Sequence, residues 1–429
     1  MTWIRGIALI SLLSAAAWLV QREQNAGRLQ RIDDAFLDFL VANSRDRFEN
    51  PSEDIQSTHP VVKVVLDQAD AIDYSDWPPQ PLDWQMLIKA LQPFSPEVLV
   101  ITTPLSWGHP APDFVPAVAE ALLPFPSVVL AAEAMTIDEG EEDDGKTTSS
   151  AFLGDLDSAL PRFKRISGPK TAAALQAVVT PPDMPLRRSG EVGLMVPETE
   201  NTASAVVRSG SDWLPTLSVQ ALSRQTRTPY SRTRIRLGSG AGLYLDGGVY
   251  VPLTQDGKIT SNPSIEVPEV NALNLLTEGF TELLTESEKA RLGSGKLMVI
   301  GIRDPNPDTI SHVDQQAAAL AAALSAPRIQ VVPVYGQWGI WAAVAGFSLW
   351  LGVFAPRPKA LKIGIIVGFL AFAAGFVAFQ SSLWWCPPSV PLAILVVGTL
   401  FGRVFGHRPT LPSEPPSSDP KIEGETATE

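Results

Sequence analysis

Cysteine, histidine and charged residues are scarce in this chain. Its single cysteine, Cys386, excludes an intrachain disulfide, and its neighbours Trp384, Trp385 and Pro387 provide no cation that would activate a thiolate. None of the four histidines has a second His or Cys at metal-ligand spacing, so we expect no zinc site and no cofactor. The sequence also lacks a nucleophile elbow, a complete phosphate-binding glycine loop and a helix-borne pair of histidines, and therefore an enzyme is not the expected function.

Positive charge is in deficit as well. The 33 lysines and arginines are outnumbered by 46 aspartates and glutamates, for a net charge of −13. Because phosphate binding needs a basic stripe, we expect no nucleic-acid partner, and solubility accounts for the acidity. Charged residues make up 18% of the chain, below the ~25% typical of soluble domains. This shortfall, with 45% hydrophobic residues, indicates that part of the chain lies in lipid.

Four apolar runs predict transmembrane helices. The first, Trp3 to Val20, predicts an N-terminal anchor over residues 1–20, although Ser14-Ala15-Ala16-Ala17 resembles a cleavage site and leaves a signal peptide open. Three further runs form a predicted membrane module over 334–408, and they cover residues 338–355, 363–379 and 390–405. Each run is long enough to cross a hydrocarbon layer of about 30 Å.

The basic residues between these runs predict an orientation in the membrane. Arg357, Lys359 and Lys362 mark the first break as cytoplasmic, and Arg403 marks the end of the last run in the same way. The second break, 380–389, has no basic residue and holds two tryptophans. We therefore expect a multi-pass protein of the bacterial inner membrane, in contact with the lipid bilayer, with residues 21–333 outside the cytoplasm.

The last segment, 409–429, is rich in proline, serine and acidic residues and nearly free of apolar ones. This composition predicts a disordered cytoplasmic tail, which at about 20 residues is too short to fold as a catalytic domain.

Residues 21–50 predict a stem helix. Apolar residues recur at helical spacing, at Leu29, Ile32, Phe36, Phe39 and Leu40. Charged residues fall elsewhere on the turn, at Arg28, Arg31, Asp34 and Asp38. The apolar face either packs on the chain's own domain or forms the seam of a homodimer, and the sequence leaves both open.

Residues 51–333 predict an α/β domain with a mixed, mostly parallel sheet covered by helices. Buried strands alternate with helices, and apolar strands without polar alternation suit a sheet covered on both faces. Predicted strands cover 61–66, 98–101, 128–130, 192–196, 205–207 and 296–301. Predicted helices cover 82–91, 114–123 with Asp113 as its cap, 217–222, 270–284 and 313–324. Asp246-Gly247-Gly248 predicts a hairpin turn, and 137–150 an acidic surface loop.

Candidate ligand-binding residues follow the strands, because ligands of open α/β sheets bind beyond the carboxyl ends of the strands. They are Asp67 and Asp70 after the first strand, Thr102 and Thr103 after the second, and Arg303, Asp304 and Asp308 after Gly301, with Trp77 over the same edge. We expect Asp67 and Arg303 to form a pair that binds a polar ligand. The alternative is that these loop residues only make caps and turns.

The order of these signals resembles the type 2 CHASE domain, a family of bacterial extracellular sensor domains followed by three transmembrane helices. The resemblance runs from about residue 28 to about 405. Its parts are Arg31, Asp34 and Phe36 in the stem, Val-Val-Lys-Val-Val-Leu-Asp at 61–67, Trp77-Pro78 before a helix, and Gly-Lys-Leu-Met-Val-Ile-Gly at 295–301. Where the family has an aspartate after the second strand this chain has Ile101-Thr102-Thr103-Pro104, and Gln80 and Pro81 replace a basic residue after Trp-Pro.

The resemblance implies a signal-input protein that binds an unknown ligand or partner outside the cytoplasm. Members of the family often carry a cytoplasmic kinase or cyclase, and this sequence has none, so we expect the output to pass to a separate cytoplasmic signalling partner. A structural or assembly subunit of a cell-envelope complex is the second hypothesis, and an extracytoplasmic enzyme is the third.

Overall fold

The chain forms two compact units. The computed structural model describes residues 2–25, 30–49, 60–74, 76–108, 113–137, 153, 156–169, 171–198, 202–238, 240–262, 265–276, 286, 289, 292–293, 296–303 and 310–405. The helical unit comprises Met1–Leu37 and Val331–Glu429, and the α/β unit comprises Asp38–Gln330. The stem segment 21–50 is therefore divided between them, and the helix α2 (Gln30–Ala42) has residues in both.

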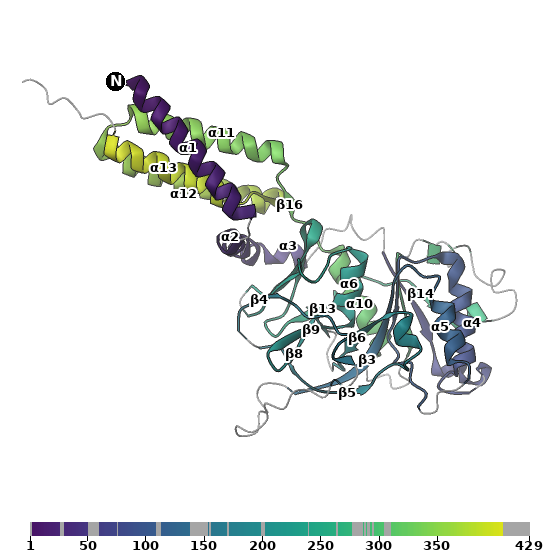
Figure 1. The fold of residues 1–429 in the computed structure, drawn as a ribbon. Helices are drawn as coiled ribbons and strands as arrows, with labels where there is room; N and C mark the ends of the chain where they lie inside the picture. The colour runs from purple at the N-terminus through teal and green to yellow at the C-terminus, as the bar shows by residue number, and fades with distance from the viewer. Residues whose placement is uncertain are drawn as a thin grey trace, which may run out of the picture. The chain divides into compact units, whose positions relative to one another are not determined.

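The α/β unit is built around a mixed, mostly parallel nine-stranded sheet (Figure 1). Its neighbours run in the order β14-β1-β15-β2-β3-β5-β8-β9, and β6 also pairs with β3. The first five strands are parallel to one another, whereas the β3–β5 and β8–β9 pairs are antiparallel. The strands are β1 (Val61–Leu66), β2 (Val98–Ile101), β3 (Val128–Ile137), β5 (Ala174–Thr180), β6 (Glu191–Met195), β8 (Val206–Ser209), β9 (Asp212–Pro215), β14 (Glu269–Asn271) and β15 (Leu297–Ile302).

Alternate residues of the central strands enter two separate cores. Val62 and Val64 of β1 pack with Trp84 and Leu87 of α4, whereas Val61 and Val65 enter the opposite core. Figure 1 shows α4 and α5 on one side of the sheet and α6 and α10 on the other. The helices are α4 (Pro81–Leu91), α5 (Val115–Leu122), α6 (Leu217–Gln225), α7 (Leu273–Leu276) and α10 (His312–Ser325). Because both faces are covered, every residue of β2 is buried, as the apolar run predicts.

Two smaller sheets complete the α/β unit. The four-stranded sheet has the order β12-β11-β10-β4, and β13 pairs with β7. Its predicted hairpin is confirmed, since β11 and β12 are antiparallel and the turn lies at Asp246–Gly248. The strands are β4 (Arg165–Ser167), β7 (Thr202–Ser204), β10 (Arg234–Arg236), β11 (Gly242–Leu245), β12 (Val249–Pro252) and β13 (Lys258–Thr260).

Several predicted element boundaries are wrong. Val270 lies in the edge strand β14 and not in a helix, because the chain pairs there with β1 before α7 begins. Phe114, and not Asp113, occupies the N-cap position of α5, and no side chain caps that helix. Most of the predicted acidic loop, 138–150, lies outside the described residues.

The helical unit contains α1 (Thr2–Asn25), α11 (Val334–Phe354), α12 (Arg357–Ser382) and α13 (Ser389–Phe405), with the first part of α2. Helix α13 packs against α1, α11 and α12 (Figure 1). The predicted break at 356–362 is mostly helical, since α12 already begins at Arg357. The second break contains the short strand β17 (Trp384–Trp385), where the Trp385 carbonyl accepts a hydrogen bond from the Val332 N–H.

Small residues line the closest contacts within this bundle. A Cβ added at Gly398 would lie 2.4 Å from the Cβ of Ser348, and one at Gly402 would lie 3.0 Å from the carbonyl oxygen of Leu351. A Cβ added at Gly352 would overlap Leu9 of α1. Helices α11 and α13 therefore meet through paired small-xxx-small motifs, which allow their backbones to approach closely.

The outer surface of the bundle is apolar. Large side chains of α12 project outward with exposed fractions of 69% for Phe369, 64% for Ile365 and 63% for Val377. By length and composition, α11 and residues Lys359–Ser382 of α12 are the two described helices that can cross a membrane, and α13 is a shorter apolar helix.

Candidate functional site

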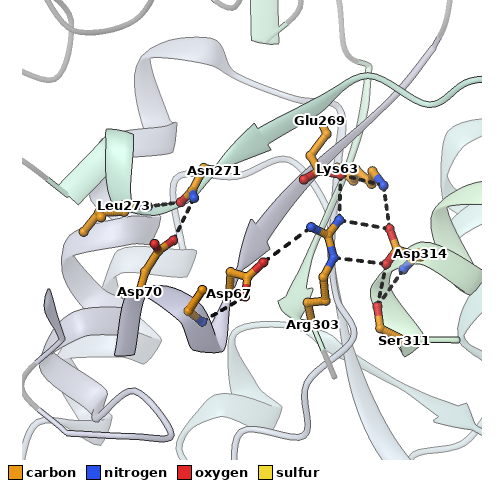
Figure 2. Close-up of polar contacts among 10 residues, drawn as sticks. Lys63, Asp67, Asp70, Glu269, Asn271, Leu273, Arg303, Ser311 and Asp314 are labelled. Carbon is orange, nitrogen blue, oxygen red and sulfur yellow. Dashed lines mark hydrogen bonds and ion pairs between the residues drawn. The ribbon is translucent and has the colours of Figure 1, made fainter. Parts of the chain in front are cut away.

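Five charged side chains converge where β1, β14 and β15 meet the first turn of α10 (Figure 2). We refer to Lys63, Asp67, Glu269, Arg303 and Asp314 as the charged cluster. Strand register builds part of it, because Lys63 of β1 lies opposite Glu269 of the parallel strand β14. Arg303 directly follows β15, which is the other neighbour of β1.

Lys63 is the more enclosed cation of the charged cluster. Its ammonium group lies 2.5 Å from an oxygen of Asp314 and 2.8 Å from an oxygen of Glu269, and its side chain is 16% exposed. A lysine in a strand with buried apolar neighbours needs such partners, because burial of an unpaired charge is costly. Lys63 therefore ties the edge strand β14 and the helix α10 to the centre of the sheet.

Arg303 contacts all three carboxylates of the charged cluster. Its guanidinium nitrogens lie 2.6 Å from Glu269, 3.4 Å from Asp314 and 3.6 Å from Asp67. Figure 2 shows the guanidinium between Asp67 on one side and Asp314 on the other. Two cations thus face three carboxylates, so the charged cluster is nearly neutral and is held together by its own ion pairs.

These ion pairs change the acidity of their members. Burial alone would raise the pKa of Glu269, but hydrogen bonds from Arg303 and Lys63 outweigh it and hold the pKa below its ordinary value. Burial alone would also raise the pKa of Asp314, but hydrogen bonds from Lys63 and Ser311 outweigh it and lower the pKa. The hydrogen bond to Glu269 raises the pKa of Arg303. Glu269, Asp314 and Arg303 therefore stay charged at neutral pH.

Helix-capping contacts extend the charged cluster. Ser311 is the N-cap of α10. Its hydroxyl donates a hydrogen bond to the Asp314 carboxylate at 2.7 Å, and the hydroxyl oxygen accepts one from the Asp314 N–H. A negative charge in the first turn also suits the helix dipole. Asp67 caps a short 3-10 helix, Gln68–Asp73, by accepting from the Ala69 N–H. Both carboxylates thus have local bonding roles besides their pairing with cations.

The predicted pair of Asp67 and Arg303 does come together, and the other candidates are placed differently. Asp70 accepts a hydrogen bond of 2.7 Å from Asn271, which in turn caps α7 through the Leu273 N–H. This contact adjoins the charged cluster in Figure 2. Asp70 therefore holds the side chain of Asn271, and ligand binding by Asp70 stays a prediction.

The contacts given for three further candidates, Thr102, Thr103 and Trp77, are with the backbone or core of the α/β unit. Thr102 is buried against Gly301, and its hydroxyl donates to the Ile300 carbonyl. The Thr103 hydroxyl accepts from the Ile302 N–H at 2.9 Å. Trp77 packs against Tyr74, with ring centroids 5.5 Å apart and the ring planes tilted by 57°, at the edge of the core under α4. Ligand binding by these three residues stays a prediction.

Asp304 and Asp308 lie outside the described residues. Three members of the charged cluster were not candidates from the sequence, namely Lys63, Glu269 and Asp314. Lys63 could have been predicted to have a carboxylate partner, because a lysine inside an apolar strand needs one. Which carboxylates these are could not be predicted, because Asp314 is distant in the sequence and Glu269 begins a strand of only three residues.

The charged cluster offers carboxylate acceptors and two cationic donors, which are groups that can recognise a polar ligand. Within the described part of the chain, no group of three or more histidine, cysteine, aspartate or glutamate side chains is arranged to hold a metal ion. Burial raises the pKa of the Cys386 thiol, and the Asp33 charge adds to this, so the thiolate is disfavoured.

Comparison of the chain with models of protein families, with curated proteins and with solved structures found no match.

Proposed function

We propose that the chain is a membrane-anchored signal-input protein of the type 2 CHASE kind. In this proposal the helical unit spans the bacterial inner membrane, and the α/β unit lies outside the cytoplasm and binds a ligand or partner. The signal passes through the helices to a separate cytoplasmic protein. The observation that carries the proposal is the distribution of side chains in the helical unit. Small residues lie at the contacts between its helices, and large apolar side chains cover its outer surface.

This surface is the reverse of what a water-soluble bundle needs. Lipid gives no hydrophobic drive to helix association, so membrane helices pack through small residues, as Ser348 and Gly352 do with Gly398 and Gly402. Exposed side chains such as Phe369 would be costly in water and are at home among acyl chains. The 21 residues of α11 extend about 31 Å, which matches a hydrocarbon layer of about 30 Å.

The two ends of the bundle differ in a way that supports the orientation. Contacts of Gly402 with Ala360 and of Gly352 with Leu9 bring the basic turn at Arg357 and the end of α13 to one end. Trp385 lies at the other end, beside the start of α13. Arg357, Lys359 and Arg403 make the first end the more basic one, although α1 ends in Arg22 toward the other, and this excess favours the first end for the cytoplasm.

Exposed aromatic rings occur near both ends of the bundle. Tyr335 and Trp338 are 82% and 56% exposed near Trp385, and Phe354 is 67% exposed near the basic turn. Aromatic side chains concentrate at the two membrane–water interfaces, so this distribution is the one expected of a spanning bundle.

Assembly in a cell-envelope complex is the second candidate function. It fits the charged cluster, whose carboxylates and cations pair with one another within the α/β unit and are partly exposed. An enzyme has no comparable support from the described residues.

Protease protection and a topology reporter test the orientation. Protease added to spheroplasts should digest the α/β unit of the full-length protein, and alkaline phosphatase fused after Pro409 should be inactive. A protected α/β unit with an active fusion would overturn the membrane topology. Affinity purification from mild detergent then separates the two functions: recovery of a cytoplasmic signalling enzyme supports signal input, and recovery of envelope proteins alone supports assembly.

A further inference from the structure

One face of α12 carries two lysines followed by exposed apolar side chains. Successive residues of an α-helix are rotated by about 100°, so Lys359, Lys362, Ile366 and Phe369 lie within an arc of about 80°. Both lysines are exposed, and Ile366 and Phe369 have exposed fractions of 57% and 69%. We call these four residues the α12 stripe. Charge comes first along the stripe and hydrocarbon follows, which is the order of the two parts of a phospholipid.

Contacts within the helical unit show that the α12 stripe faces away from α13. A Cβ added at Gly364 would overlap Thr399 of α13, and one added at Gly368 would lie 3.4 Å from Leu395. Helix geometry places these two glycines about half a turn around α12 from the stripe. In the membrane topology that we propose, the α12 stripe therefore faces lipid.

The chain supplies no carboxylate beside the two lysines among the described residues of the helical unit. No aspartate or glutamate occurs in residues 1–22 or 334–413. The Asp33 carboxylate bonds Ser389 at the start of α13, whereas the contact of Gly402 with Ala360 brings the end of α13 to the start of α12. An ammonium group in apolar surroundings is costly without a counter-ion, so an anion from outside the chain fits this position.

We propose that the α12 stripe binds one anionic phospholipid, with its phosphodiester at Lys359 and Lys362 and its acyl chains along Ile366 and Phe369. This inference rests on the proposed function, because it requires α12 to span the bilayer. The two lysines lie one turn apart, about 4.5 Å along the axis, and can both reach one phosphate group. Lys359 is in the first turn of α12, where the helix dipole also favours an anion.

The length of the α12 stripe fits one leaflet of the membrane. From Lys359 to Phe369 the helix extends about 15 Å, which is half of a hydrocarbon layer of about 30 Å. A lipid whose phosphate lies at the lysines therefore has its acyl chains beside the apolar part of the stripe. The exposed side chains of Ile365 and Leu370 widen this apolar part on both sides.

Net charge decides which phospholipid the α12 stripe prefers. Phosphatidylglycerol has a net negative charge, whereas the trimethylammonium group of phosphatidylcholine cancels the charge of its phosphate. Attraction of one basic residue to an anionic membrane lipid corresponds to about a fivefold change in affinity. Two lysines therefore predict a preference of about ten- to thirtyfold for phosphatidylglycerol.

The experiment uses the full-length protein in phosphatidylcholine nanodiscs with a small fraction of a photoreactive lipid. The probe is phosphatidylglycerol with a diazirine in one acyl chain, or phosphatidylcholine with the same diazirine, and peptide mass spectrometry locates the adducts. We expect phosphatidylglycerol to label Ile366 and Phe369 about tenfold more often. Both leaflets hold the same lipids, so the orientation of the protein does not affect the result.

The variants test the role of the two lysines. Lys359→Gln/Lys362→Gln should reduce labelling by phosphatidylglycerol to the level of phosphatidylcholine, and Lys359→Arg/Lys362→Arg should keep the preference. Lys89→Gln/Lys164→Gln is the matched control, because it removes the same charge from exposed positions of the α/β unit and should change nothing.

Three outcomes would overturn the proposal. Equal labelling by the two lipids, or an undiminished preference in Lys359→Gln/Lys362→Gln, would remove the lipid site and leave the spanning helix intact. Loss of the preference in excess inorganic phosphate would indicate a site for free anions and not for a lipid. The absence of α12 adducts from either lipid would overturn this site together with the proposed membrane span.

Discussion

The close approach of α11 and α13 gives a prediction whose size follows from the structure. A Cβ at Gly398 would lie 2.4 Å from the Cβ and 2.9 Å from the Cα of Ser348. Ordinary carbon contacts are about 3.5–4.0 Å, so Gly398→Leu forces the helices apart by about 1 Å. The clash involves backbone and cannot be relieved by a rotamer change. Overpacking of this kind costs about 2–3 kcal/mol.

Gly346→Leu on α11 is the matched control, because a Cβ there meets nothing within 4 Å. Both substitutions gain about 0.8–1 kcal/mol of helix propensity, so the difference between the two variants isolates the clash. Unfolding of the full-length protein by sodium dodecyl sulfate in mixed micelles, followed by tryptophan fluorescence, measures that difference. Equal stability of the two variants, within about 0.5 kcal/mol, would refute the inference that small residues set the packing of the bundle.

Three further predictions concern the α/β unit. Arg303→Met should lower its free energy of unfolding in denaturant by about 2–3 kcal/mol, because three carboxylates are left with one lysine, whereas Arg162→Met, in exposed pairs, should cost under about 1 kcal/mol. Acid should destabilise the unit: the two carboxylates with lowered pKa values bind protons more readily when unfolded, so their contribution is present above about pH 4.5 and is lost as the pH falls through the lowered pKa values. Thermal melts between pH 7 and pH 3 should show this slope, and Glu269→Gln should flatten it; an identical slope in the variant would contradict the assignment. Gly301→Ala should lower the melting temperature because its Cβ would overlap the Thr102 hydroxyl, and Thr102→Ala in the same chain should restore part of the loss; no rescue would argue that other contacts set the cost.

The strands of the α/β unit were predictable because burial on both faces leaves a continuous apolar run. Val61–Leu66 and Val98–Ile101 are confirmed at their predicted bounds. Their order in the sheet was not predictable, since β15 inserts between β1 and β2 although it is far later in the sequence. Parallel pairing is non-local, and no turn residue records which strands become neighbours.

Some contacts between charged side chains were predictable from the sequence, and others were not. The rule that ligand residues follow parallel strands brought Asp67 and Arg303 together, and the structure has them 3.6 Å apart. Asp38 could not be found by that route, because helical periodicity assigns a polar residue to solvent unless its partner is known. Its partner Arg234 lies 196 positions away. The exposed fractions of Ile32, 51%, and Phe39, 44%, show the same limit for apolar residues on α2.

The position of α13 has a consequence for how the protein is made. This helix is the common neighbour of α1, α11 and α12, yet the ribosome completes it after all of them. In the membrane topology that we propose, the first helix persists in the bilayer while the whole α/β unit is synthesised, before its principal partner exists. The bundle cannot close before α13 has been made, so chains that stop before Ser389 contain a first helix without its principal partner.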